Sequence, residues 1–296
     1  MKKGEINMIN SKTTQTIEQP VKQSFRPIAF RNRGNKHSFI TRLMSPGDLG
    51  QLVKPFVFLD YFESEAFYGK GMNVHPHSGI ATHTTLLEGT TDYEDSTGKS
   101  GTLHPGSVEW MQAGGGVWHG GTPSQGKPIR GYQLWVALHE ELELAPAKSQ
   151  YFDNNILESD GTVRILLGTY GNLRSSIYLP VPITYLHVRL KDGEKWSYQP
   201  DSSHDVAWVA VNQGKLHVSD SVLQKEMAVF SEGNQAIEFQ AEGAVEFVLG
   251  SSAKHPHPLV TGYYSVHTSE ETLIKGEAGI EKLGRTPEVI AMRNKL

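Results

Sequence analysis

The sequence predicts an all-β protein of two tandem barrels with one short helix near the C-terminus. Both halves of the 296-residue chain contain short apolar and β-branched runs. Turn residues separate these runs at intervals of about 8–12 positions, which is typical of sandwiches and barrels. The chain also has 30 glycines and 15 prolines, which suits a turn-rich fold. Only one stretch carries a capped helical pattern, so we expect strands to dominate.

Composition excludes several classes of function. The net charge is −4 and there is no long run of lysine or arginine, so direct binding to nucleic acid is not expected. The chain has no cysteine, which excludes disulfides, iron–sulfur clusters and thiolate zinc sites and leaves histidine, aspartate and glutamate as metal ligands. Residues 4–33 lack the apolar core of a signal peptide, and no apolar run is long enough to span a membrane. We therefore expect a soluble cytoplasmic protein.

The first half contains the strands of the first predicted barrel. Residues 1–24 are polar and are expected to form a flexible tail. Residues 25–150 form the predicted first domain, with strands within 25–43, 56–62, 80–87 and 130–138. The continuous apolar run from Phe56 to Phe62 suits a buried strand. A charged connection that ends at Pro146 places the domain boundary near residue 150.

Residues 151–296 are predicted to form the second barrel and the helix. Apolar runs at 163–168, 183–190, 205–211, 215–219 and 245–250 are read as strands, and Asn212 to Lys215 as a hairpin connection. The helix is expected at 270–283, after the capping signal at 268–271, and outside the second barrel. Gly276 and Gly279 each weaken this helix by roughly 1 kcal/mol relative to alanine, so packing must hold it.

Three histidines lie in a run that is predicted to be one extended strand. Side chains alternate along a strand, so His75, His77 and His83 share a face with Gly79 and Ala81. His75 and His77 are about 7 Å apart at Cα and can hold one ion, whereas His77 and His83 are roughly 20 Å apart on a straight strand. A bend at Gly79 would shorten that distance. The paired histidines predict half of a metal site, and a hairpin must bring back a third ligand.

A longer string of motifs resembles the pirin family of the cupin superfamily. The motifs are His75-Pro76-His77-Ser78-Gly79, Leu86-Leu87-Glu88-Gly89, Glu94-Asp95-Ser96-Thr97-Gly98, Pro105-Gly106, Trp110-Met111-Gln112-Ala113-Gly114 and Gly116-Val117-Trp118-His119. The resemblance extends from about residue 26 to the segment 262–268. It implies two cupin (jelly-roll) barrels, with a metal only in the first. It also implies that His75, His77 and His119 are metal ligands.

The sequence departs from the family at the fourth ligand. The family has a glutamate two residues after the last histidine, and here that position is Gly121. Ala81, where many cupins carry a glutamate, offers no ligand either. Water could complete the site, or His83 could do so; otherwise His83 supports the ligands or pocket, or is a core histidine. Glu94 and Glu109 are nearby carboxylates, and structural hydrogen bonds are expected of Glu109.

The ligand set restricts the metal. Three neutral imidazoles leave a divalent ion at a formal +2, where the family's glutamate would leave +1, so the pKa of bound water should fall further. Imidazole ligands suit several transition metals. We expect one ion per chain, Fe(II) in the first place, with Ni, Mn, Cu or Zn as alternatives.

The remaining histidines are not expected to bind metal. His255 and His257 repeat the paired spacing, but their flanking prolines favour an extended loop. The second barrel is predicted to bind no metal, because its histidines have no partner at metal-ligand spacing. These histidines are His187, His204 and His217. Three large aromatic residues are expected to pack at a barrel mouth or a domain interface: Trp196, Tyr263 and Tyr264.

The resemblance implies two kinds of function. Some bacterial pirins resemble flavonol (quercetin) 2,3-dioxygenases, which open the heterocycle and release carbon monoxide. This implies a metal-dependent oxygenase with O2 and a flavonoid-like aromatic substrate, although Gly121 lacks the natural proton acceptor. Animal pirins resemble transcription co-regulators, which implies the alternative of a metal- or redox-responsive protein with a protein partner. A storage or structural cupin is a third interpretation.

Overall fold

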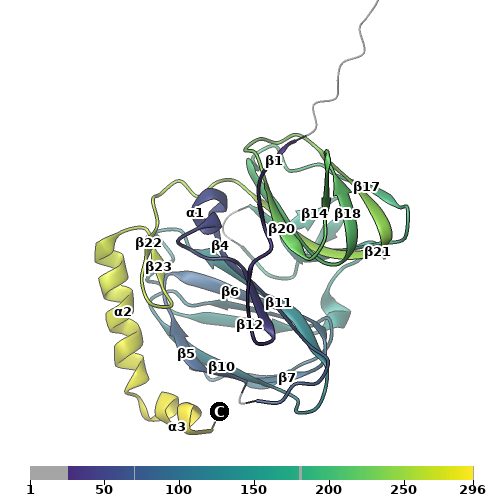
Figure 1. Cartoon of the computed structure of the whole chain (residues 1–296). Coiled ribbons are helices and arrows are strands. Elements are labelled where there is room, and N and C mark those ends of the chain that lie inside the picture. The colour runs from purple at the N-terminus through teal and green to yellow at the C-terminus, as the bar shows by residue number, and fades with distance from the viewer. Residues whose placement is uncertain (1–25, 70, 180–181, 296) are drawn as a thin grey trace, which may run out of the picture.

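The computed structural model describes residues 26–69, 71–179 and 182–295. Two β-barrels lie against each other, and two helices run along the side of the first barrel (Figure 1). The prediction of an all-β fold with two tandem barrels and C-terminal helical structure is confirmed. The predicted tail, residues 1–24, lies outside the described residues. Within the part that is described, no helix has the length and apolar character needed to cross a membrane.

The first barrel is formed by a seven-stranded and a four-stranded antiparallel sheet. The larger sheet has the order β12-β9-β6-β11-β4-β3-β2, with β2 (Asn35–His37), β3 (Ile40–Met44), β4 (Phe56–Ser64), β6 (Ile80–Glu88), β9 (Val108–Gln112), β11 (Ile129–Ala137) and β12 (Lys148–Phe152). The smaller sheet has the order β5-β10-β7-β8, with β5 (Met72–His77), β7 (Thr91–Asp95), β8 (Ser100–Leu103) and β10 (Val117–Pro123).

The second barrel is formed by one eight-stranded sheet. Its path is β1-β20-β18-β21-β16-β13, with β17 on β21 and β19 on β18. The bounds are β1 (Ile28–Asn32), β13 (Val163–Leu167), β16 (Ile183–Leu190), β17 (Lys195–Tyr198), β18 (Val206–Val218), β19 (Ser221–Leu223), β20 (Glu226–Phe230) and β21 (Ile237–Ser252). The short elements are the hairpins β14 (Thr169–Tyr170) with β15 (Leu173–Arg174) and β22 (Val260–Thr261) with β23 (Val266–His267), and the helices α1 (Leu49–Val53), η1 (Asn154–Ile156), α2 (Glu270–Gly284) and α3 (Pro287–Lys295).

Each end of the described chain packs with the barrel of the other half. The predicted division at residue 150 did not anticipate this exchange. β1 pairs with β20 and so belongs to the sheet of the second barrel. The helix α2 packs against β10 and β5 of the first barrel (Figure 1). There Trp118 Nε1 donates to the carbonyl oxygen of Ile280 at 2.8 Å. The helix lies outside the second barrel, as expected, but it packs against the first barrel rather than with residues 151–296, with which it was grouped. Periodicity indicates which face of a helix is buried but not which domain buries it.

The helix itself begins and ends close to the predicted residues. Ser269 is the N-cap, and its hydroxyl accepts a hydrogen bond from the backbone N–H of Thr272 at 3.2 Å. The capping box predicted for residues 268–271 is not formed, because Glu271 does not accept the hydrogen of the Thr268 N–H. Instead Thr268 donates through its N–H and its hydroxyl to the buried carboxylate of Glu143, at 2.8 and 2.9 Å. The start of α2 is thus tied to the first barrel.

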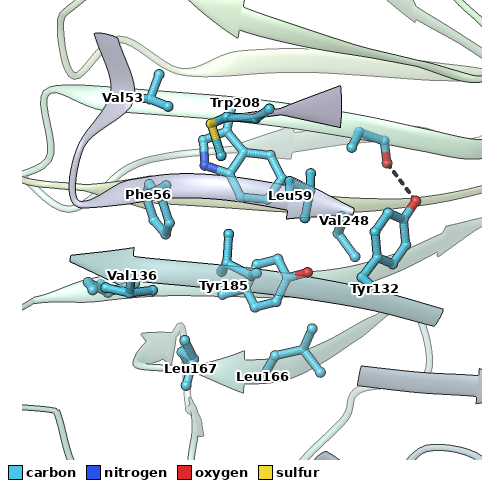
Figure 2. Close-up of a cluster of buried hydrophobic side chains, with 14 of the residues drawn as sticks. Val53, Phe56, Leu59, Tyr132, Val136, Leu166, Leu167, Tyr185, Trp208 and Val248 are labelled. Atoms are coloured by element: carbon cyan, nitrogen blue, oxygen red, sulfur yellow. Dashed lines mark hydrogen bonds between the residues drawn. The ribbon is translucent and has the colours of Figure 1, made fainter. Parts of the chain in front are cut away.

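The largest apolar core lies where the two barrels meet (Figure 2). Phe56 and Tyr132 of the first barrel pack with Trp208 and Tyr185 of the second, and all four side chains are fully buried. The ring centroids of Phe56 and Trp208 are 5.5 Å apart, and the Tyr132 hydroxyl donates to the carbonyl oxygen of Ala210. An aromatic side chain removes about 150–250 Å² from water when buried. The barrels therefore share a core and stabilise each other.

The run from His75 to Leu87 forms two strands rather than one. β5 ends at His77, β6 begins at Ile80, and the two strands belong to different sheets. Between them Gly79 adopts a φ of +73°, a conformation that glycine accepts and other residues rarely adopt. This turn interrupts the alternation of side chains, so the faces of β5 do not continue into β6.

Candidate metal centre

Three histidine rings converge inside the first barrel. His75 and His77 lie on β5, and His119 lies on the neighbouring strand β10. The antiparallel register pairs His119 directly with His75. Residues two apart on a strand share a face, and so do directly paired residues on adjacent strands. One ring nitrogen from each of the three histidines lies within 4.8 Å of the others, so all three can reach one ion.

Backbone oxygen atoms orient two of these rings. The Nδ1 atom of His75 lies 2.7 Å from the carbonyl oxygen of Asn73, and that of His77 lies 3.0 Å from the carbonyl oxygen of Tyr264. A carbonyl oxygen can only accept, so both Nδ1 atoms carry the hydrogen and both Nε2 atoms keep a free lone pair. His77 Nε2 is buried without a hydrogen-bond partner, and the Nε2 atoms of His75 and His119 are 3.2 Å apart. A divalent metal ion would satisfy these converging lone pairs.

Burial keeps the two imidazoles of β5 in the form that binds metal. Burial, followed by the nearby ring of His119, lowers the pKa of His75 to about 3. Burial, with smaller effects from His75 and His119, places the pKa of His77 well below its ordinary value. Metal ligation requires neutral imidazole. Neither side chain has to lose a proton at neutral pH before it can bind a metal.

Comparison with known proteins agrees with this architecture. The sequence model of the family described as Pirin matches residues 38–136. A pirin-like protein from Caulobacter vibrioides is 30% identical over 234 residues, which cover 73% of this chain and 79% of that protein. The chain belongs to the pirin family.

Two solved structures share the fold of this pirin-family chain. Quercetin 2,3-dioxygenase from Acinetobacter baumannii has a TM-score of 0.80 at 24% identity, over 90% of this chain and all of that chain (100%). The bacterial pirin YhhW from Escherichia coli, in complex with nickel(II), has a TM-score of 0.61 at 18% identity, over 76% of this chain and 99% of that chain. At these identities the likeness shows the fold, and the chemistry has to be argued from the residues of this chain.

Gly121, where the resemblance led us to expect a glutamate, borders a small cavity inside the first barrel. The cavity has a volume of about 40 Å³ and lies between the two sheets, where its lining includes Met72, Thr84 and Leu86. A Cβ atom at position 121 would lie 3.1 Å from Thr91 Cγ2. Apolar space therefore borders position 121, where the resemblance led us to expect a carboxylate.

Glu109 lies next to the histidine cluster, a contact that was not predicted from the sequence. Its side chain is buried on β9, and its Oε1 atom lies 3.6 Å from His119 Nδ1. The expected structural hydrogen bonds are present, because the Thr84 hydroxyl donates to Oε2 at 2.6 Å. One feature of the sequence could have indicated this contact. Glu109 lies among the apolar residues of the strand β9, and a carboxylate that such a strand buries needs hydrogen-bond partners.

His83 does not join the cluster, which corrects the expectation that it could be the fourth ligand. It is fully buried on β6, its ring centroid is 5.2 Å from that of Tyr185 in the second barrel, and its Nδ1 lies 3.2 Å from the Thr85 hydroxyl. The expectation placed His83 on the same strand face as His75 and relied on a bend at Gly79 to bring it near, whereas the turn at Gly79 separates the two strands. Burial lowers the pKa of His83 to about 3. This residue is a neutral core histidine between the barrels.

Tyr264 covers one side of the cluster from a segment far along the chain. It lies between β22 and β23, and its ring centroid is 5.3 Å from that of His75. Its φ of +63° is in the left-handed region, which a tyrosine rarely adopts, and such strain is concentrated at functional sites. Its neighbour Tyr263 is 76% exposed and contacts the Tyr264 ring. The C-terminal segment thus gives the centre both a carbonyl acceptor for His77 and an aromatic wall. Trp196, in contrast, packs within the second barrel against Phe239.

The other histidines have different partners. His255 uses both ring nitrogens, because Nε2 lies 3.2 Å from the Leu138 carbonyl oxygen and Nδ1 accepts from the His257 N–H. The isolated histidines of the second barrel have oxygen partners: His187 with Glu246, His204 with Ser251 and His217 with Glu242. Among the described residues, the cluster on β5 and β10 alone brings three ligating groups within 4.8 Å of one another.

Behind the metal centre lies a chain of three polar side chains that resembles a hydrolytic triad. The Ser78 hydroxyl is 3.0 Å from His267 Nε2, and His267 Nδ1 is 3.4 Å from a Glu143 oxygen. All three residues are at most 1% exposed, and Gly276 of α2 packs directly on Ser78 and His267. No substrate can reach this serine, so the three residues link the C-terminal segment to the strand that carries His77.

Proposed function

We propose that this pirin is a metal-dependent oxygenase that acts on quercetin, a related flavonol or another aromatic compound of that type. The observation that carries the proposal is the convergence of three histidines, in which His77 Nε2 has no partner and the Nε2 atoms of His75 and His119 are 3.2 Å apart. Three protein ligands leave coordination positions open for a substrate, as in catalytic metal sites. The Tyr264 ring beside His75 provides an aromatic surface at this place. The solved Acinetobacter relative bears the name of the same activity.

The donor set fits one divalent transition metal held by His75, His77 and His119. Imidazole suits Fe, Ni, Cu and Zn, and we favour Fe(II) with Ni, Mn, Cu and Zn as alternatives. The nickel complex of the Escherichia coli relative makes nickel the first alternative to compare. When bound, the metal supplies a Lewis acid for the substrate oxygen and a site for reaction with O2.

The residues of the chain hold the ligands in place and keep water away. His77 and His119 are 0% and 4% exposed, so their rings lie in a largely dry environment. Trp135 packs against the His77 ring with centroids 4.7 Å apart, and Phe58 stacks on Trp135 at 4.0 Å. A low-dielectric setting strengthens the electrostatic interactions of a bound substrate. These contacts suit a centre that must bind an aromatic anion and exclude side reactions.

The alternative is a metal- or redox-responsive regulatory protein without turnover. Gly121 favours this alternative, because the glutamate that it replaces would be the natural acceptor for the proton of the flavonol hydroxyl. A metal bound without that base could still change the surface around Tyr263 and Tyr264, where a protein partner would bind.

Quercetin turnover by metal-loaded protein separates the two functions. For an oxygenase we expect loss of the flavonol absorption band, with consumption of O2 and release of carbon monoxide. His77→Ala should abolish both metal binding and turnover, because two imidazoles compete poorly with the hydration of the ion. His257→Ala is the matched control and should retain both. Stoichiometric metal binding without quercetin loss would support the regulatory function, and equal metal loss in the two variants would contradict the assigned site.

A further inference from the structure

Glu109 lies in a buried setting that lacks an ordinary counter-charge. The residue is 4% exposed, and its Oε2 atom accepts from the Thr84 hydroxyl at 2.6 Å. Its Oε1 atom is 3.3 Å from the Tyr151 hydroxyl and 3.6 Å from His119 Nδ1. Among the described residues, His119 is its one basic neighbour within 4 Å.

A second buried carboxylate stands beside the first. Asp95 is 3% exposed and is the register partner of His119 across β7 and β10. It accepts from the Tyr151 hydroxyl at 2.7 Å and from the backbone N–H of Thr97 at 2.7 Å. No lysine or arginine of the described chain forms an ion pair with it. Tyr151 therefore connects two buried acids, and it donates its single hydrogen through the shorter contact to Asp95.

Two carboxylates in one dry region are unfavourable unless a cation lies near them. The nearest group that could hold a cation is the histidine cluster, reached through His119. Its Nε2 atom faces His75 at 3.2 Å, so its Nδ1 atom faces Glu109. A carboxylate on the far nitrogen of a metal-bound histidine fixes the tautomer and makes the imidazole a better ligand.

We propose that Glu109 is a positioning residue that faces the Nδ1 hydrogen of His119, accepts it when a metal is bound, and supplies to the metal centre the negative charge that Gly121 does not. This inference rests on the proposed metal site. The carboxylate acts through His119 rather than by touching the ion, so the coordination position next to Gly121 stays open. With Glu109 counted, the formal charge of a divalent centre falls from +2 to +1, the value that the family's glutamate would give.

The test compares Glu109→Gln with the parent protein in a chelator competition for Ni²⁺ and Zn²⁺. Glutamine keeps the size of the side chain and can still accept from Thr84, but it removes the charge. We expect affinity to fall by about 10- to 100-fold, the usual effect of losing such a partner. The matched control is Glu94→Gln on β7, the strand next to the one that carries His119. The Glu94 carboxylate pairs with Lys295, and its loss should not change affinity. Equal affinities for Glu109→Gln and the parent would overturn the inference, whereas a parent that binds no metal would contradict the proposed function itself.

A measurement on the unmodified protein keeps the inference testable if Glu109→Gln does not fold. In the Zn²⁺-loaded protein, nitrogen-15 spectra should show His119 with a hydrogen on Nδ1 and the metal on Nε2, and that hydrogen should exchange slowly. Metal on Nδ1 of His119, or an Nδ1 hydrogen that exchanges freely with water, would overturn the proposed role of Glu109.

Discussion

A glutamate introduced at position 121, two residues after His119, would have room in the small cavity of the first barrel that Gly121 borders. Position 121 shares strand parity with His119, and the Thr91 methyl, 3.1 Å from where the new Cβ would lie, needs to move only slightly. We predict that Gly121→Glu tightens binding of a divalent cation by about tenfold, or roughly 1.4 kcal/mol, and raises quercetin turnover if the reaction needs that base.

Gly121→Gln is the control for this change, because it adds the same bulk without the charge. Equal metal affinity for the two variants would show that the carboxylate does not reach the ion. His83→Ala, measured in the same titration, should leave affinity unchanged, since His83 faces Tyr185 rather than the cluster. A loss of metal in His83→Ala would reinstate His83 as a ligand.

His83 makes the stability of the protein depend on pH. Its pKa is about 3 in the folded state, where burial opposes the charged form, and ordinarily about 6.5 when unfolded. Below pH 6.5 the unfolded state binds more protons at His83 than the folded state does. The contribution of neutral His83 to stability is therefore fully present above pH 6.5 and is lost as the pH falls toward 3. In the metal-free protein, the unfolding free energy of His83→Gln should therefore depend less steeply on pH. Between pH 3 and 6.5 we predict that its slope against pH is smaller than that of the parent by roughly 1.4 kcal/mol per pH unit. Denaturant titrations across pH 4–6 measure it.

At the scale of the elements, α2 connects the C-terminal segment to the back of the metal centre. Gly276 allows this contact, because a Cβ there would lie 2.4 Å from His267 Nε2 and 2.5 Å from the Ser78 hydroxyl. An alanine in an exposed helix position would stabilise by about 1 kcal/mol relative to glycine. Here we predict the opposite sign: Gly276→Ala should destabilise by about 1–3 kcal/mol through overpacking and weaken metal binding through the strand that carries His77.

Ala278→Gly in the same helix separates propensity from packing, since Ala278 is exposed. That change should cost about 1 kcal/mol and leave metal affinity intact. If Gly276→Ala raised the melting temperature, the close contact between α2 and the first barrel would be disproved.

At the scale of the whole molecule, the shared core makes the two barrels one cooperative unit. Trp208 of the second barrel is fully buried and packs on Phe56 of the first. We predict that Trp208→Ala lowers the free energy of unfolding by about 3–5 kcal/mol and lowers the stability of both barrels together. Calorimetry, with metal release as a probe of the first barrel, measures this.

Trp196→Ala is the comparison, because Trp196 is only partly buried and packs within the second barrel. Its loss should cost less and should leave a single transition. Two separate transitions in the parent protein would show that the barrels unfold independently, contrary to the contacts between them.

Local patterns in the chain were enough to predict the class of the fold and the chemistry of the donors. Strand runs and turn residues do not depend on distant contacts, so the tandem barrels and the helix from Glu270 could be predicted from them. The absence of cysteine limited the ligands to histidine and carboxylates. His75 and His77 followed from strand alternation, whereas His119 came from the family resemblance, because no local rule states which distant strand pairs with β5.

The side chains that support the site, in contrast, depend on tertiary contacts. Glu109, Tyr264 and α2 come to the histidine cluster through strand register and chain crossings that have no periodic signal in the sequence. The role of His83 was left open by the sequence for a related reason. Alternation holds only while the backbone stays extended, and the left-handed turn at Gly79 separates β5 from β6 and directs His83 toward the second barrel. The chemistry of the ligands is local and can be read from the chain, but the environment that tunes them is set by long-range packing.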